Sequence, residues 1–262
     1  MRTLHFDADG VRLHAVEQGA GPLMVLFHGG GATHHALLPL AGELAPDHRV
    51  ITPDLRGSGR SWCAAPLTWD RLADDVAALL DSVGAGRAIV GGPSMGAAVA
   101  LRFALRHPDR VAALVMLAPA CGGAEFGWTE FQINQLAGLD RVMSSAGDKG
   151  FDALRQFYQA SPAMAAYFDA NVGDWDLASF RATTAFMAGG AQPFERAADL
   201  AVLDCPTLVI PGDDPMHPAE VAALIESAIP GCVTRPAPNG GAANNKAIAI
   251  EVSAFCAVAA RW

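Results

Sequence analysis

The segment 87–108, RAIVGGPSMGAAVALRFALRHP, most strongly limits what this chain can fold into. A short apolar run ends at Gly92, and an alanine-rich stretch with helical spacing begins directly after Ser94. A strand that turns so abruptly into a buried helix is typical of a parallel sheet covered by helices. Gly92 and Gly96, two residues on either side of the serine, permit the sharp turn because they have no Cβ.

The same alternation of apolar runs and helix-period segments continues along the chain. The apolar runs predict strands within the ranges 23–31, 49–59, 111–120, 206–214 and 232–238. Helical spacing closed by glycines predicts a helix over 69–86. The fold class expected from this order is α/β, with a mostly parallel sheet covered by helices on both faces.

Residues 121–197 interrupt this alternation. Aromatic and methionine residues recur there at helical spacing, without a strand-like run between them. We therefore predict a helical cap over residues 121–197, inserted into a core domain formed by residues 1–120 and 198–262. Most of the aromatic residues are expected to form the core of the cap, and a few to line a pocket.

Composition excludes several classes of function. A chain of 262 residues that is 52% hydrophobic is long enough to bury a large core. A formal charge of −9 without any run of Lys and Arg argues against nucleic acid binding. No apolar run reaches the length of a membrane span, and the first ten residues are too polar for a secretory leader. No membrane role is expected.

The five cysteines are odd in number and widely scattered, which predicts reduced thiols in a cytoplasmic protein. Cys121, at the end of a predicted strand, is the one cysteine expected near a site. No cluster of His, Cys and carboxylate residues has the spacing of metal ligands, so we expect no metal and no cofactor. The oligomeric state is left open, a homodimer included.

Three segments carry residues suited to acyl transfer. Gly92-Pro93-Ser94-Met95-Gly96 matches the G-x-S-x-G pattern that lifts a nucleophilic serine above a sheet. The developing oxyanion needs two N–H donors, which we assign to Met95 and to Gly30 in FHGGG.

An acid that holds a histidine in the right tautomer is expected at the end of a later strand. Asp213 and Asp214 both follow the apolar run LVIPG. We prefer Asp214, because the Asp-Pro step and the later Pro218 stiffen its loop. Glu125, after the strand at 111–120, is a rival position.

Together, the motifs HGGG, DLRGSGRS, GGPSMG and LVIPGDDPMHP, with the lid-like insertion, resemble the α/β-hydrolase superfamily over nearly the whole chain. In that family the nucleophile, the acid and a histidine follow one another in this order. The resemblance maps the serine onto Ser94, the acid onto Asp214, and the oxyanion donors onto Gly30 and Met95.

Two details qualify the match. Many relatives have one more residue between the glycine of the acid's turn and the aspartate, which keeps the choice between Asp213 and Asp214 open. Asp54 and Arg56 match residues that usually brace loops in the family, so we assign them no catalytic role.

The family's histidine follows the last strand, in a short Gly-His turn. Here that place reads NGGAAN over residues 239–244, and no histidine follows His217. Ala242 takes the histidine's position, with Ala243 as a second candidate. We interpret Ala242 as an engineered His→Ala substitution beside an intact serine; natural loss of hydrolysis and replacement by another histidine are the alternatives.

Among the other histidines, His217 lies three residues past Asp214, and His34 and His35 follow the oxyanion loop. His28 is expected to brace its own turn. The remaining four are expected at the surface or near the terminus: His5, His14, His48 and His107.

The sequence thus predicts a serine hydrolase that cleaves an ester, lactone or thioester of a small apolar or aromatic molecule through an acyl-enzyme. With alanine at 242, the chain is expected to be catalytically impaired. The alternatives are a non-catalytic receptor for a small molecule and a carbon–carbon bond hydrolase on the same fold.

Overall fold

The computed structural model describes residues 1–159, 162–238 and 244–259. At its centre lies one eight-stranded sheet with the order β1-β2-β4-β3-β5-β6-β7-β8. β2 pairs antiparallel with β1 and with β4, and all the other neighbours are parallel. This confirms the predicted mostly parallel sheet. The strands are β1 (Arg2–Ala8), β2 (Val11–Gln18), β3 (Leu23–Leu26), β4 (Arg49–Pro53), β5 (Ala88–Pro93), β6 (Val111–Leu117), β7 (Thr207–Ile210) and β8 (Val233–Thr234).

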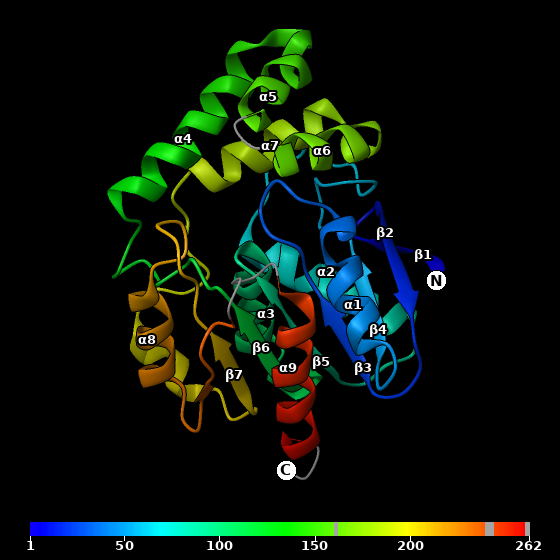
Figure 1. Ribbon diagram of the computed structural model, residues 1–262, viewed down its shortest axis with the longest axis vertical. Helices are drawn as coiled ribbons and strands as arrows, with labels where there is room; N and C mark the ends of the chain where they lie inside the picture. The colour runs from blue at the N-terminus through cyan, green and yellow to red at the C-terminus, as the bar shows by residue number, and fades with distance from the viewer. Residues whose placement is uncertain (160–161, 239–243, 260–262) are drawn as a thin grey trace.

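Helices cover both faces of the sheet, as predicted (Figure 1). Successive residues of a strand point to opposite faces, so each central strand is apolar throughout. On β3, Met24 packs in the cluster with α1 and α9, whereas Val25 packs in the cluster with α2, α3 and α8. Within the described residues, the helices on these faces are α1 (Leu38–Leu44), α2 (Trp69–Ser82), α3 (Met95–Arg106), α8 (Ala219–Ala228) and α9 (Asn245–Ala259).

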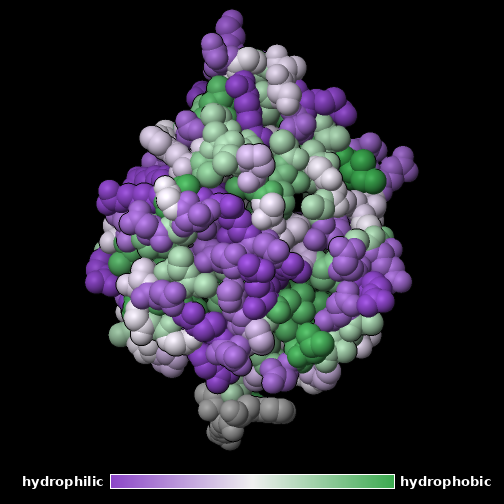
Figure 2. Space-filling view, turned by 180° about the vertical axis from the view of Figure 1, so that it is seen from behind, coloured by the Kyte–Doolittle hydropathy of each residue, from purple (hydrophilic) through white to green (hydrophobic). Residues whose placement is uncertain are grey.

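The outer surface of α2 and α3 is polar and faces the solvent. Thr68 caps the N-terminus of α2, where its side chain accepts a hydrogen bond from the Arg71 N–H. Outward-facing carboxylates of α2 pair with arginines of α3, such as Asp70 with Arg102. Seen from behind, hydrophilic residues cover the middle of the molecule and hydrophobic residues form smaller, scattered patches (Figure 2).

The cap, which we define as residues 121–197, follows β6 and ends at the first residue of the 3₁₀ helix η5 (Ala197–Val202). Its described part contains helices and no strand, and it stands at one end of the sheet (Figure 1). A separate cluster of buried side chains forms its core: Met143, Leu154, Phe168, Trp175 and Phe180. The longer helices are α4 (Glu130–Ser145), α5 (Gly150–Tyr158), α6 (Pro162–Asn171) and α7 (Leu177–Ala188).

The chain enters and leaves the cap through two adjacent segments. The Ala124 N–H donates to the Phe194 carbonyl over 3.0 Å, and the Glu125 N–H donates to the Glu195 carbonyl over 2.9 Å. The outgoing and returning segments thus form a hydrogen-bonded neck between the cap and the core. None of the helices in the described ranges is long and apolar enough to cross a membrane.

Candidate active site

Ser94 sits in a sharp turn between β5 and α3. Its φ of 55° and ψ of −118° place a non-glycine residue in a strained region of backbone space. The turn presses against the end of β3: a Cβ on Gly92 would lie 2.0 Å from the Phe27 carbonyl oxygen, and one on Gly96 1.9 Å from it. Both glycines of the G-x-S-x-G pattern are thus required by close backbone contact.

The two predicted oxyanion donors both lie at the cavity that Ser94 borders. Gly30 and Met95 line the same cavity as the serine, and a Cβ on Gly29 would lie 3.6 Å from the Ser94 Cβ. Met95 is the first residue of α3, where an N–H has no acceptor within the helix. An anion at this point also meets the positive end of the α3 dipole.

His28 holds residues 27–33, the loop of the predicted oxyanion donor Gly30 and here called the oxyanion loop, to the core. Its Nε2 accepts a hydrogen bond from the Leu55 N–H over 3.0 Å, so its Nδ1 carries the proton that is donated to the Gly29 carbonyl over 2.8 Å. Complete burial lowers the pKa of His28 and keeps the ring neutral. These contacts match the bracing role expected from the sequence.

The cap contacts the same loop through two tyrosines. The Tyr158 hydroxyl donates to the Gly31 carbonyl over 3.2 Å, and the Tyr167 hydroxyl accepts a hydrogen bond from the Thr33 N–H over 2.9 Å. Burial raises the pKa of Tyr158 to about 12, so its hydroxyl stays protonated and remains a donor. No sequence pattern pointed to these contacts.

Asp214 makes the contacts expected of an orienting acid. Its carboxylate accepts hydrogen bonds from the backbone N–H of Met216 over 2.8 Å and from His217, whose Nδ1 lies 2.8 and 3.0 Å from the two carboxylate oxygens. Burial raises the pKa of Asp214, but the bonds from the His217 side chain and from the two backbone groups outweigh it and hold the pKa below its ordinary value.

A cavity of about 120 Å³ joins this acid to the serine. Ser94, Asp213, Asp214 and His217 all contribute to its lining. Glu125, the third candidate acid, is exposed and is not among the described residues that line either cavity at Ser94.

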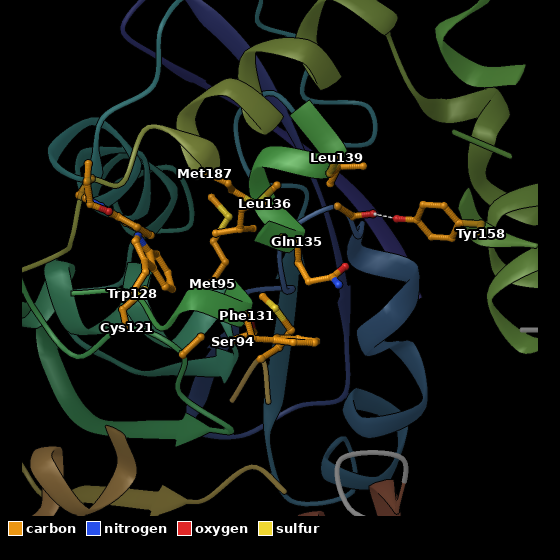
Figure 3. Close-up of a pocket in the computed structure, with 16 residues that line it drawn as sticks. Ser94, Met95, Cys121, Trp128, Phe131, Gln135, Leu136, Leu139, Tyr158 and Met187 are labelled. Atoms are coloured by element: carbon orange, nitrogen blue, oxygen red, sulfur yellow. Dashed lines mark hydrogen bonds between the residues drawn. The ribbon is translucent and has the colours of Figure 1, made fainter. Parts of the chain in front are cut away.

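Ser94 also borders a second and larger cavity of about 330 Å³ under the cap. Figure 3 shows Trp128 and Cys121 to one side of Ser94 and Tyr158 on the far side, reaching toward the oxyanion loop. Most of the lining is apolar, and none of the described residues that form it carries a charge. The lining residues are Gly30, Gly31, Trp69, Ser94, Met95, Ala120, Cys121, Trp128, Phe131, Gln135, Leu136, Leu139, Tyr158, Met187, Ala191 and Met216.

Cys121 lies at this cavity, as the sequence suggested, but it is not a reactive thiol. Its side chain is buried, and burial raises its pKa to about 12. It therefore acts as a small apolar wall residue.

Two of the histidines expected at the surface are in fact buried: His14 and His48. His14 is buried because β2 lies between two other strands, and its Nδ1 donates to Asp54 over 3.0 Å. His34 also donates its Nδ1 to Asp54, over 2.8 Å. The ligand-type atoms of these three residues lie within 4.8 Å of one another, and their hydrogen bonds already satisfy the carboxylate.

Asp54 further accepts hydrogen bonds from the N–H groups of His34 and Arg60, and Arg56 makes two hydrogen bonds to Asp75. Both residues therefore brace loops, as expected. His35 faces Asp174 of the cap at 3.3 Å. Ala242 and Ala243, where the resemblance places the histidine, lie outside the described residues.

Comparison with known proteins points to one family. The family model described as the alpha/beta hydrolase fold matches residues 22–240. The chain is similar to the lipase LipV of Mycobacterium tuberculosis, with 42% identity over 111 residues that cover 42% of each chain. It is also similar to a 2-hydroxymuconate semialdehyde hydrolase of a Pseudomonas species, with 31% identity over 195 residues, 71% of this chain and 62% of the relative.

These matches span less than two thirds of the length of either relative. Solved structures align over more of the chain. A hydrolase from Pseudomonas aeruginosa matches 97% of this chain and 98% of its own, with a TM-score of 0.79 at 24% identity. The enol-lactonase of Burkholderia xenovorans matches 97% of this chain and 100% of its own, with a TM-score of 0.78 at 20% identity. At these identities the likeness establishes the fold alone.

Proposed function

The chain belongs to the alpha/beta hydrolase fold family, and on that premise we propose that it is a serine hydrolase acting on an uncharged carboxylic ester, lactone or thioester. The observation that carries the proposal is the position of Ser94 between two cavities. One cavity has mostly apolar walls and includes Gly30 and Met95, the proposed oxyanion donors, and the other is lined by Asp213 and Asp214. An acyl group bound in the first would present its carbonyl carbon to the serine.

In the proposed reaction, the Ser94 oxygen attacks the carbonyl carbon and the hydroxyl proton passes to a base. The Gly30 and Met95 N–H groups stabilise the oxyanion of the tetrahedral intermediate. The intermediate collapses to an acyl-serine as the leaving alcohol or thiol takes up the proton. Water then attacks the carbonyl carbon of the acyl-serine. The bond to the serine oxygen breaks, the serine takes up a proton, and the acid product is released.

The lining of the larger cavity supports an apolar acyl group. Burying a charged group without a partner is costly, and the described lining offers no ionic partner. Trp69, Trp128 and Phe131 supply aromatic walls, and Met187 and Met216 supply adaptable ones. A volume of about 330 Å³ fits a small molecule.

The family's histidine, which serves as the base in the proposed reaction, is missing from its expected position. The family's position for it reads Ala242, which has no group to accept a proton. Loss of a triad histidine lowers kcat on the order of 10⁶-fold in a serine protease. We propose that the chain as it stands is an impaired hydrolase and that Ala242→His increases its turnover by several orders of magnitude.

The experiment compares hydrolysis of p-nitrophenyl acetate, butyrate and octanoate by the unmodified chain, Ala242→His and Ala242→His/Ser94→Ala. Turnover that rises with histidine at 242 and disappears with Ser94→Ala supports the proposal. Ser227→Ala in the same background is the matched control, because Ser227 is exposed on α8 and is not among the residues lining the cavities at Ser94.

Covalent labelling distinguishes a serine hydrolase from a non-catalytic receptor. A fluorophosphonate should label Ala242→His at Ser94, as read by peptide mass spectrometry. A protein that binds small apolar esters saturably but stays unlabelled would instead be a receptor, and the proposal would be abandoned.

Carbon–carbon bond hydrolysis is a second candidate, favoured by the similarity to 2-hydroxymuconate semialdehyde hydrolase. It is tested by offering that semialdehyde to the Ala242→His variant beside the esters. Cleavage of the semialdehyde without ester turnover would select this second function.

A further inference from the structure

The structure accounts for most of the histidines of this chain without reference to Ser94. His14 and His34 bind Asp54, and His28 bridges Gly29 and Leu55. His35 faces Asp174, and His107 faces Asp74. His48 is buried at the other end of the sheet, and His5 packs against His14. Of the eight histidines, all within the described ranges, His217 is the one that lines either of the two cavities described at Ser94.

His217 is already held in the form that a base requires. Its Nδ1 faces both oxygens of the Asp214 carboxylate, at 2.8 and 3.0 Å. The low pKa of Asp214 means that the carboxylate is ionised and accepts this bond, so Nδ1 carries the ring proton. The other nitrogen, Nε2, is then left as a proton acceptor.

The ring is also fixed in place by its backbone. His217 and Asp214 form an isolated β-bridge, and the His217 N–H donates to the Asp214 carbonyl over 2.9 Å. A Cβ on Gly212 would lie 2.3 Å from the His217 Cβ, so the glycine makes room for this side chain. The His217 side chain is 21% exposed, which limits its motion without sealing it from the cavity.

We propose that His217, oriented by Asp214, is the residual general base of Ser94 in a chain that has alanine at 242. This inference rests on the proposed serine hydrolase function. Among the described residues, no hydrogen bond joins the Ser94 hydroxyl to His217. In the proposed step the proton crosses the 120 Å³ cavity by way of water, for which the cavity offers space and polar lining residues.

Proton transfer and bond formation at Ser94 are coupled in this step. The Ser94 O–H bond breaks, its proton passes to the water, and a water proton passes to Nε2 of His217. The serine oxygen forms a bond to the acyl carbon, whose carbonyl π electrons move to the oxygen. The imidazolium beside Asp214 later returns a proton through the cavity to the leaving oxygen or sulfur, as the bond to the acyl carbon breaks.

The central test is a pair of variants at position 217 in the otherwise unmodified chain. His217→Asn keeps an N–H donor near the place of Nδ1, so it preserves the bond to Asp214 but has no base. His217→Ala removes both the bond to Asp214 and the base. We expect both to lower Ser94-dependent kcat by about 10²–10⁴-fold, the usual contribution of a general base, with a smaller change in KM. His107→Ala, at the end of α3, is the control and should leave turnover unchanged.

Free imidazole gives a readout that a structural role would not produce. Imidazole should restore turnover in His217→Ala, whose cavity it fills, and should stimulate the unmodified chain far less. If imidazole stimulates both proteins equally, it replaces only the histidine that is missing at 242. His217 then supplies no base, and the proposal is overturned. Thermal unfolding monitored by circular dichroism establishes that each variant is folded.

Two further outcomes distinguish this inference from the proposed function. If His217→Asn is as active as the unmodified chain, His217 only braces the acid's turn, and the inference is wrong. The inference also fails if the unmodified chain shows no turnover above Ser94→Ala while Ala242→His is active. If neither chain exceeds the Ser94→Ala background and neither is labelled by the fluorophosphonate, the proposed function itself fails.

Discussion

The carbonyl oxygen of Phe27 lies against Gly96, so that a Cβ on this glycine would come within 1.9 Å of it. The contact joins the end of β3, where the oxyanion loop begins, to the first turn of α3 behind Ser94. Neither partner can move aside, because each belongs to the buried backbone of the central sheet and its helix. The serine turn can therefore lie this close to the oxyanion loop only because Gly96 has no Cβ.

Gly96→Ala is expected to destabilise the protein by more than ~2 kcal/mol, because the methyl group forces a backbone shift in a tightly packed region. Gly42→Ala is the matched control: Gly42 lies in α1, and a Cβ added there would have no atom within 4 Å. That change should stabilise the helix by up to ~1 kcal/mol. Urea unfolding of the two variants checks the difference, and equal stabilities would contradict the packing argument.

Gly30→Ala should alter substrate choice more than stability. A Cβ at this position would lie 2.4 Å from the Met187 sulfur, which ends a flexible side chain and is able to shift into the larger cavity. We expect kcat/KM to fall more for the octanoate than for the acetate ester in the Ala242→His background.

Adding Met187→Ala to that variant should recover most of the loss. Gly86→Ala, at a glycine with no atom within 4 Å of the added carbon, serves as the control. An equal loss for both esters would mean that the added methyl group disturbs the oxyanion N–H rather than the walls of the cavity.

Asp54→Asn should destabilise the fold by ~2–4 kcal/mol, because the buried side chains of His14 and His34 lose a charged acceptor. Asp47→Asn, at an exposed residue of the loop before β4, should change the stability by less than ~0.5 kcal/mol. Thermal unfolding at neutral pH measures both. A small effect at Asp54 would show that the two imidazoles find other partners.

Because of the Asp54 carboxylate, we also expect the free energy of unfolding to depend on pH. Burial raises the pKa of Asp54, but hydrogen bonds from His14 and His34 outweigh it and hold the pKa well below its ordinary value. Such an acid stabilises the folded state above its unfolded pKa of about 3.9, and the contribution is lost as the pH falls toward the folded pKa. Below about pH 4, stability should therefore drop more steeply in the unmodified chain than in Asp54→Asn, as measured by urea unfolding across pH.

Cys121 should resist alkylation in the folded protein. Its side chain is 4% exposed, and burial raises its pKa to about 12, so almost no thiolate forms at neutral pH. Iodoacetamide should react first at the half-buried Cys63, as read by peptide mapping. Fast reaction at Cys121 that is slowed by a bound ester would instead show that the cap opens widely in solution.

The central strands could be predicted from the sequence, because their apolar composition agrees with their buried place in the fold. Each apolar run predicted within 23–31, 49–59 and 111–120 contains a strand, β3, β4 and β6 respectively. These strands are buried on both faces, so continuous apolar character is their signature.

The N-terminal hairpin was not predicted. β1 and β2 are joined at Asp9-Gly10, and both residues have positive φ, of 45° and 74°. An Asp-Gly step between alternating residues is a known signal for a two-residue hairpin turn, and it is present in the sequence. The error at His14 has the same origin, because a histidine near the N-terminus is expected at the surface unless the strand that contains it is recognised.

Contacts that cross from the cap to the core could not be predicted at all. Thr33 and Tyr167 are 134 residues apart, and neither lies in a motif with a fixed partner. Periodicity specifies which side of a helix is buried but not which loop it meets. Site residues next to strand ends are therefore easier to predict from the sequence than the cap residues that contact them.

The neck at Ala124–Phe194 and Glu125–Glu195 has an evolutionary consequence. Because the outgoing and returning segments are adjacent, one insertion or exchange event at this point would place a different set of pocket walls over an unchanged turn at Ser94. Substrate range and bond-breaking chemistry would then diversify separately, the first on the inserted segment and the second on the two stretches of the gene that flank it.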